Sequence, residues 1–157
     1  GGVRVSAARF AGSALVGAFN IATMPGPGRA AELRTWLSGG GSAGLVVGVD
    51  LYPGTSGGRV LLADVNGDGG LDLLVAPDGG VPMLLRAYDL ATGAVVLDAP
   101  AGAGGYRGVN VASGVFGGFR ELVIGRGPGE APTVATFRIG AGGAVAQRLG
   151  LTVFEVP

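Results

Sequence analysis

The chain contains no cysteine, no histidine and no lysine among its 157 residues. Without cysteine it can form neither a disulfide nor a thiolate metal site, and it offers no thiol nucleophile. Without histidine it lacks the commonest general base and the commonest ligand of transition metals. These absences exclude much of enzyme chemistry, including any Ser-His-Asp triad formed within the chain.

Charge and long hydrophobic runs are also scarce. Eleven arginines balance eleven Asp and Glu residues, and no basic cluster is present. We therefore expect no nucleic-acid partner and no attraction to an anionic membrane. Gly or Pro interrupts every apolar run well before the roughly 20 residues of a transmembrane helix, so membrane insertion is not expected. The opening sequence GGVRVSAARF is unlike a signal peptide, as expected for a mature exported chain or a segment of a longer one.

Glycine, by contrast, is abundant. The chain has 34 glycines and an apolar content of 48%. The glycines follow no three-residue period, which excludes collagen, and the apolar content is sufficient for a folded core. Many short strands joined by tight turns are the expected result.

A repeat of about fifty residues runs through the chain, with units that begin at Gly1, Gly57 and Arg107. Each unit contains an opening strand, a polar or glycine-containing turn, an apolar strand, a Gly/Pro loop and a third strand. A further turn and a fourth strand follow, and the units close on VDLYP, VLDAP and VFEVP. Proline cannot continue a β ladder, so it suits the end of a unit.

This repeat predicts an all-β, β-propeller-like fold with about three four-stranded antiparallel blades in one repeat domain, residues 1–157. The approximate blades are residues 1–56, 57–106 and 107–157. One such sheet cannot cover both of its faces, whereas radial repetition can. Closed propellers usually have about four to eight blades, so we expect an incomplete ring, a segment of a longer propeller, or completion by self-association into a homo-oligomer or filament.

The turn of the second unit, DVNGDGGLD, carries a candidate metal site. Side-chain oxygens recur at alternate positions on Asp64, Asn66 and Asp68, and again on Asp72, while the carbonyl of Gly70 offers another. Calcium prefers several oxygen ligands in an adaptable shell. A divalent hard cation would also relieve the repulsion among three carboxylates. The sequence therefore predicts one Ca²⁺ site.

Two other interpretations of this turn remain open. Its first six positions match an EF-hand, but Val75 stands where the bidentate Glu belongs, and the flanking sequences are strand-like. Alternatively, the turn is a hairpin tip that uses Asn, Asp and Gly only for their turn conformations. Such a tip gives no reason for the acid at Asp72.

The order of strands and the DVNGDGGLD turn resemble FG-GAP repeats, also called VCBS-type repeats, of integrin α-chain propellers and many secreted bacterial proteins. The resemblance covers the whole chain in three units, but the calcium motif is complete only in the second. It implies a calcium ion bound by Asp64, Asn66, Asp68 and Asp72, an extracellular location, and a role in adhesion, ligand binding or assembly. The third unit keeps only Glu121 near the last ligand position, so it is not expected to bind calcium well.

Other motifs are weaker. GPGRAA, residues 26–31, fits the G-x-G-x-x-A pattern and is a remote alternative as a nucleotide-binding loop, although Pro27 removes an amide that a phosphate cradle could use. GGSAG and GTSGG match the nucleophile-elbow pattern G-x-S-x-G. Ser42 and Ser56 have no histidine to activate them, so we expect both to be turn residues.

Two of the three acids of the turn could form the carboxylate pair of a glycosidase, but the sequence has no aromatic-rich sugar cleft. We expect the scattered aromatics to pack between blades; they include Trp36, Tyr88, Phe116 and Phe137. The chain is thus predicted to be a non-enzymatic, extracellular, calcium-binding repeat module with a structural, self-assembly or adhesion role. The alternative is a carbohydrate- or protein-binding module with a glycan or protein ligand.

Overall fold

The computed structural model describes residues 2–9, 19–37, 57–78, 84–100, 109–126, 131–140 and 145–152. Within these ranges the chain forms eleven β-strands and no helix. Accordingly, no helix in this part of the chain is long and apolar enough to cross a membrane. The strands form three antiparallel sheets, which confirms the predicted all-β class.

Each sheet is a meander in which strands consecutive in the chain pair antiparallel. Sheet 1 contains β1 (Val3–Arg9), β2 (Phe19–Pro25) and β3 (Arg34–Leu37). Sheet 2 contains β4 (Gly58–Ala63), β5 (Asp72–Pro77), β6 (Leu84–Asp89) and β7 (Val95–Pro100). Sheet 3 contains β8 (Val109–Phe116), β9 (Phe119–Arg126), β10 (Thr133–Ile139) and β11 (Val145–Thr152). The fourth strand expected before the VDLYP end of the first unit lies outside the described residues.

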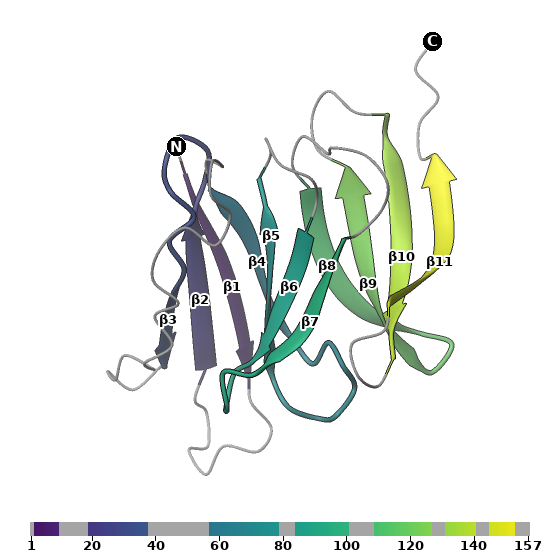
Figure 1. The fold of residues 1–157 in the computed structure, drawn as a ribbon, viewed down its shortest axis with the longest axis horizontal. Coiled ribbons are helices and arrows are strands. Elements are labelled where there is room, and N and C mark those ends of the chain that lie inside the picture. The colour runs from purple at the N-terminus through teal and green to yellow at the C-terminus, as the bar shows by residue number, and fades with distance from the viewer. Residues whose placement is uncertain are drawn as a thin grey trace.

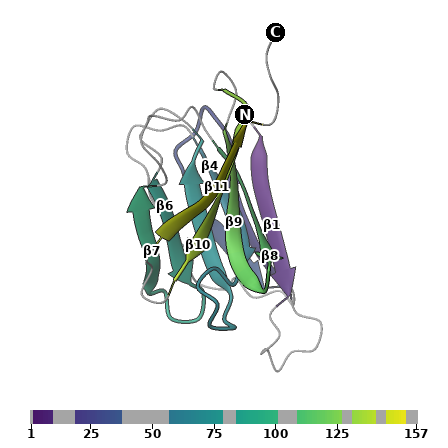
Figure 2. The same ribbon diagram turned by 90° about the vertical axis from the view of Figure 1, so that its right-hand side faces the viewer.

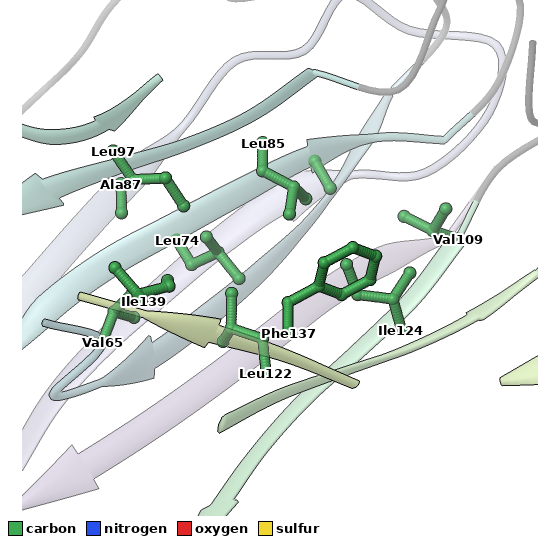
Figure 3. Packing of buried hydrophobic residues seen from close by; sticks show 11 residues of the cluster. Val65, Leu74, Leu85, Ala87, Leu97, Val109, Leu122, Ile124, Phe137 and Ile139 are labelled. Atoms are coloured by element: carbon green, nitrogen blue, oxygen red, sulfur yellow. The ribbon is translucent and has the colours of Figure 1, made fainter. Parts of the chain in front are cut away.

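The three sheets form a row with sheet 2 in the middle (Figure 1), and Figure 2 views this row from its sheet 3 end. Strand β4 contacts β1 and β2 on one side and β8 on the other. Two hydrophobic cores fill the spaces between the sheets. Core A joins sheets 1 and 2 and includes Met24, Leu33, Leu62, Leu73 and Val75. Core B joins sheets 2 and 3 and includes Leu74, Leu85, Leu122, Ile124 and Phe137 (Figure 3).

Strand β5 contributes to both cores. Successive side chains of a strand point to opposite faces, so Leu73 and Val75 enter core A while Leu74 and Ala76 enter core B. All six residues of β5 are buried. This explains why the sequence LDLLVA is continuously apolar after its acid instead of alternating with polar residues.

Equivalent positions in the three sheets follow from the strand pairing. In every sheet, the first residue of the first strand pairs with the last residue of the second: Val3 with Pro25, Gly58 with Pro77, and Val109 with Arg126. Counting from these pairs, the third strands carry an aromatic residue at one shared position: Trp36, Tyr88 and Phe137. By the same count, the second strands carry a polar residue at one shared position: Asn20, Asp72 and Glu121.

The shared aromatic position also defines which faces of the three sheets correspond. We call the face that carries the third-strand aromatic the leading face, and the opposite face the trailing face. The leading face of sheet 2 packs Tyr88 against core A, toward sheet 1. The leading face of sheet 3 packs Phe137 in core B, toward sheet 2. Each of these two interfaces thus joins the leading face of one sheet to the trailing face of the sheet before it.

Polar contacts also join sheets 1 and 2. The Asp78 carboxylate accepts a hydrogen bond from Arg59 Nε at 3.1 Å and lies 3.5 Å from an Nη atom of Arg4. The Ser6 hydroxyl oxygen accepts a hydrogen bond from the Leu62 backbone N–H at 3.0 Å. These contacts connect β1 to β4 at the edge of core A.

Gly57 allows the two sheets to approach closely. Its φ of +79° is in the left-handed region, and a Cβ atom there would lie 2.5 Å from backbone atoms of Pro25 and Gly26. Any side chain at this position would therefore push the start of β4 away from the end of β2.

Replacing Gly57 by alanine should cost more stability than the same change at Gly28. Gly28 also has a positive φ, of +95°, but a Cβ atom there meets nothing. Gly28→Ala should lower the free energy of unfolding only through its unfavourable backbone conformation, by about 1–2 kcal/mol. Gly57→Ala should add an overpacking cost of about 1–3 kcal/mol. Urea denaturation of both variants measures the difference, and equal losses would contradict the close approach.

Candidate metal centre

The residues predicted to bind calcium lie in the loop that joins β4 to β5, except Asp72, which is the first residue of β5. The loop spans residues 64–71 and projects below the central sheet in Figure 1. Gly67 and Gly69 have φ values of +84° and +87°, which residues with a side chain rarely adopt. The loop can therefore fold back so that its own N–H groups face its acidic side chains.

Asp64 lies inside this loop. Its Oδ1 accepts a hydrogen bond from Gly67 N at 2.6 Å, and its Oδ2 accepts one from Gly69 N at 3.0 Å. Only 9% of its side chain is exposed. Both oxygens are thus held in place by the backbone that follows them.

Asn66 and Asp68 form a second, more exposed group. The Asn66 side-chain amide donates to Asp68 Oδ2 at 2.8 Å, and Asn66 Oδ1 accepts from Asp68 N at 3.0 Å. Asp68 Oδ1 accepts from Gly70 N at 2.6 Å. These bonds stabilise the turn and leave the side chains at the surface of the loop.

Asp72 is the unusual member of the set, because it is fully buried. Its Oδ2 accepts hydrogen bonds from Val65 N at 2.7 Å and Asn66 N at 3.3 Å. Its Oδ1 is buried and has no hydrogen-bond partner in the described structure. Burial raises the pKa of the Asp72 carboxyl, and the charges of Asp68 and Asp64 raise it further, while the two backbone hydrogen bonds lower it. A buried charged oxygen without a partner is costly, so this atom has the chemistry to bind a positively charged ligand.

The chemistry of the set fits a hard cation. Carboxylate and amide oxygens are the ligands that Ca²⁺ prefers, and an ionised carboxylate has enough lone pairs to bind a cation and accept an N–H. In the described ranges, however, no three His, Cys, Asp or Glu side chains converge closely enough to hold a metal ion. The reason is visible in the hydrogen bonds: the side chains of Asp64, Asn66 and Asp68 are turned toward N–H groups of the loop. Binding by these residues and by the Gly70 carbonyl stays a prediction.

Arg120 of β9 is a part of the site that the sequence did not reveal. Its Nε lies 3.1 Å from Asp64 Oδ2, although the two residues belong to different sheets. Both residues line a cleft of about 120 Å³, whose other lining residues are Val65, Ser113, Gly114, Val115, Glu121 and Leu122. This volume is below the roughly 300 Å³ at which small-molecule sites begin. The cleft suits an ion or a few water molecules.

Asp89 of β6 is a second residue that sequence reasoning missed. It lies directly opposite Asp72 in the β5–β6 pairing. Its Oδ1 accepts hydrogen bonds from the Thr92 hydroxyl at 2.7 Å and the Thr92 backbone N–H at 2.6 Å, and these bonds lower its pKa. Like charges opposite each other destabilise a pair of strands, so the start of β5 gathers more negative charge than the turn alone suggests.

The position of Asp72 is filled differently in the other sheets. In sheet 3 the equivalent Glu121 forms an ion pair with Arg138, whose Nη2 lies 3.1 Å from Glu121 Oε1. In sheet 1 the equivalent residue is Asn20, which carries no charge. The buried carboxylate without a cationic partner is thus specific to sheet 2 among the three sheets.

The structure also bears on the alternative motifs. Strands β4 and β5 flank the acidic loop where an EF-hand has helices. The GPGRAA segment is followed by β3 and not by a helix, and Gly26 N already donates to Gly2 O at 2.7 Å. It therefore lacks the helix N-terminus that binds phosphate in dinucleotide folds. Ser42 and Ser56 lie outside the described residues.

No protein-family model, curated protein or solved structure matches this chain. The interpretation of the site therefore depends on its own geometry and chemistry.

Asp72→Asn should change how stability depends on pH in the presence of a chelator. A carboxyl with a raised pKa binds its proton more tightly in the folded state, so ionising Asp72 removes stability as pH rises from about 4 through the folded-state value. The variant has no such loss and should be at least as stable as the parent at pH 7. A difference of one between the folded and unfolded pKa corresponds to about 1.4 kcal/mol in the free energy of unfolding. Urea denaturation between pH 4 and pH 7 measures both profiles, and parallel profiles would contradict the assignment.

Arg120→Gln should tighten calcium binding. The guanidinium of Arg120 would compete with a cation for Asp64 Oδ2, and a half-exposed ion pair of this kind is worth up to about 1 kcal/mol. Removing it should lower the Kd for calcium by up to about fivefold and cost a comparable amount of stability in chelator. Isothermal titration calorimetry gives the first quantity and urea denaturation the second. An increase in Kd would mean that Arg120 supports the site instead of competing for it.

Proposed function

We propose that this chain is a calcium-binding, β-propeller-like repeat module that acts as a structural element outside the cell. The observation that carries the proposal is the buried Asp72 Oδ1, which has no hydrogen-bond partner among the described residues and stands at the end of an oxygen-rich loop. A cation at this point would neutralise a carboxylate that burial otherwise disfavours in its charged form.

The proposed ligands are Asp64, Asn66, Asp68 and Asp72, with the carbonyl of Gly70. All five residues lie on the segment that leads from the end of β4 to the first residue of β5. An ion bound there would tie the end of β4 to the start of β5. Because β5 supplies side chains to both cores, fixing its first residue would stabilise all three sheets.

The propeller-like part of the proposal is supported by the common orientation of the sheets. In a propeller each blade presents the same face to the blade before it. The resemblance to FG-GAP repeats supports the same arrangement, and with it an extracellular role in adhesion or assembly. The absence of cysteine and histidine from the chain suits a module whose contribution is not catalytic.

The expected energetic effect of the ion is modest. For a Kd of about 10⁻⁴ M, typical of extracellular modules, millimolar calcium would add about 1.4 kcal/mol to the free energy of unfolding. For a domain of this size that corresponds to a rise in Tm of about 3–6 °C.

Thermal unfolding in chelator, in 1–10 mM calcium and in magnesium at the same concentration tests the proposal. We expect calcium to raise Tm by about 3–6 °C or more, and magnesium to raise it less, because Mg²⁺ demands a stricter octahedral shell. Asp68→Asn should abolish most of the calcium effect. Asp98→Asn is the matched control, since Asp98 is an exposed acid of β7, outside the loop, that pairs with Arg86. A Tm that is the same in chelator and in calcium would contradict the proposal, and the loop would then be a turn without a bound ion.

A further inference from the structure

The leading face of sheet 1 is exposed and apolar. It carries Val3, Val5 and Ala7 on β1, Ile21 on β2 and Trp36 on β3. Val3 is 67% exposed, Val5 is 62% exposed and Trp36 is 37% exposed. Sheet 1 lies at one end of the row of sheets in Figure 1, so no other sheet of the described residues meets its leading face.

The equivalent residues of the other two sheets are buried or half-buried. Val60 of sheet 2 and Val111 of sheet 3 occupy the position of Val5, and both pack in or against a core. Tyr88 and Phe137 occupy the position of Trp36; Tyr88 packs against core A, and Phe137 is only 5% exposed. Sheet 1 thus presents a face of the kind that the molecule covers wherever another sheet is available.

The trailing face of sheet 3, at the other end of the row, is the complementary surface. It carries Phe116 and Phe119, which are 49% and 52% exposed, and the half-buried Val123 and Val134. Phe116 lies seven residues after the first residue of β8, as Val65 lies seven after the first residue of β4, and Val65 is buried in core B. The guanidinium of Arg138 lies 3.6 Å from the centroid of the Phe119 ring and also pairs with Glu121.

We infer that a second copy of this chain docks head to tail, with the trailing face of its sheet 3 on the leading face of sheet 1. The molecule already forms this kind of interface twice, between sheets 1 and 2 and between sheets 2 and 3. A second copy supplies the same pairing of faces a third time. On these two faces Arg34 pairs with Glu32 and Arg138 pairs with Glu121, so docking leaves no charge of either pair unpartnered. Arg9, the last residue of β1, also lies on the leading face of sheet 1.

This interface joins two different surfaces, so it is heterologous. Heterologous contacts build a closed ring when the rotation between copies closes, and a filament when it does not. The inference rests on the repeat-module part of the proposed function and not on its calcium ion. Association should therefore persist in chelator as long as the chain stays folded.

Two charged substitutions test the interface from its two sides. Val5→Arg blocks the leading face of sheet 1, and Phe116→Arg blocks the trailing face of sheet 3. Each should weaken self-association of the 157-residue chain by at least about tenfold, because a charge then faces an apolar surface. Sedimentation velocity and light scattering between about 1 µM and 1 mM, a range that covers affinities of weak to moderate interfaces, measure the effect.

Mixing the two variants is the decisive measurement. The Val5→Arg chain keeps an intact trailing face and the Phe116→Arg chain keeps an intact leading face. An equimolar mixture should therefore form one-to-one dimers although neither variant associates alone. A mixture that stays monomeric would overturn the head-to-tail pairing.

Val95→Arg is the matched control. Val95 lies on β7, is 58% exposed, and belongs to sheet 2, so the same substitution there should leave self-association unchanged. Circular dichroism and thermal unfolding establish that each variant is folded, and Val3→Arg replaces Val5→Arg if the latter is not. A parent chain that remains monomeric at 1 mM, or a control that weakens association as much as Val5→Arg, would overturn the inference. Because the series is run in chelator and in calcium, loss of the calcium effect and loss of association are recorded separately.

Discussion

Strand β5 has no face that meets water. Its odd-numbered side chains enter core A, its even-numbered side chains enter core B, and its first residue is a carboxylic acid. The loop before it must therefore stabilise the Asp72 carboxylate without bulk solvent. Two backbone N–H groups satisfy one oxygen, and the other is left over. The acidic loop, the raised pKa and the proposed cation all follow from a charge at the entrance of a doubly buried strand.

The same position in three sheets shows three ways of burying a polar group. Asn20 is neutral, Glu121 is neutralised by Arg138, and Asp72 keeps one oxygen unpaired. Burial of a charge is tolerated when a partner or an ion compensates it. Sheet 2 is the only one of the three in which that compensation is incomplete within the described structure, and it is also the sheet that both neighbours pack against. Asp72 therefore belongs both to the candidate metal site and to the sheet that holds the other two sheets together.

Much of the fold could be predicted from the sequence, because its signals are local. The three-unit repeat and the glycine-rich turns predict short antiparallel strands in three sheets. The residues of the acidic loop could also be identified, since their spacing is local. Arg120 could not, because Asp64 lies 56 positions away and only the packing of sheet 3 on sheet 2 brings the two together. The sequence also could not predict that the side chains of the loop accept hydrogen bonds from the loop's own N–H groups. The spacing of oxygen-bearing residues does not determine which donor each oxygen binds.

The serial arrangement of the sheets has a consequence for how the molecule unfolds. Sheets 1 and 3 each pack through one core, whereas sheet 2 packs through two. Coupling between the outer sheets therefore passes through the middle one, as in a short one-dimensional array. Loss of an outer sheet would still leave one interface intact, but loss of the central sheet would leave none. Cooperativity in this chain is thus not shared evenly among its units, and the middle unit alone determines whether the other two unfold together or separately.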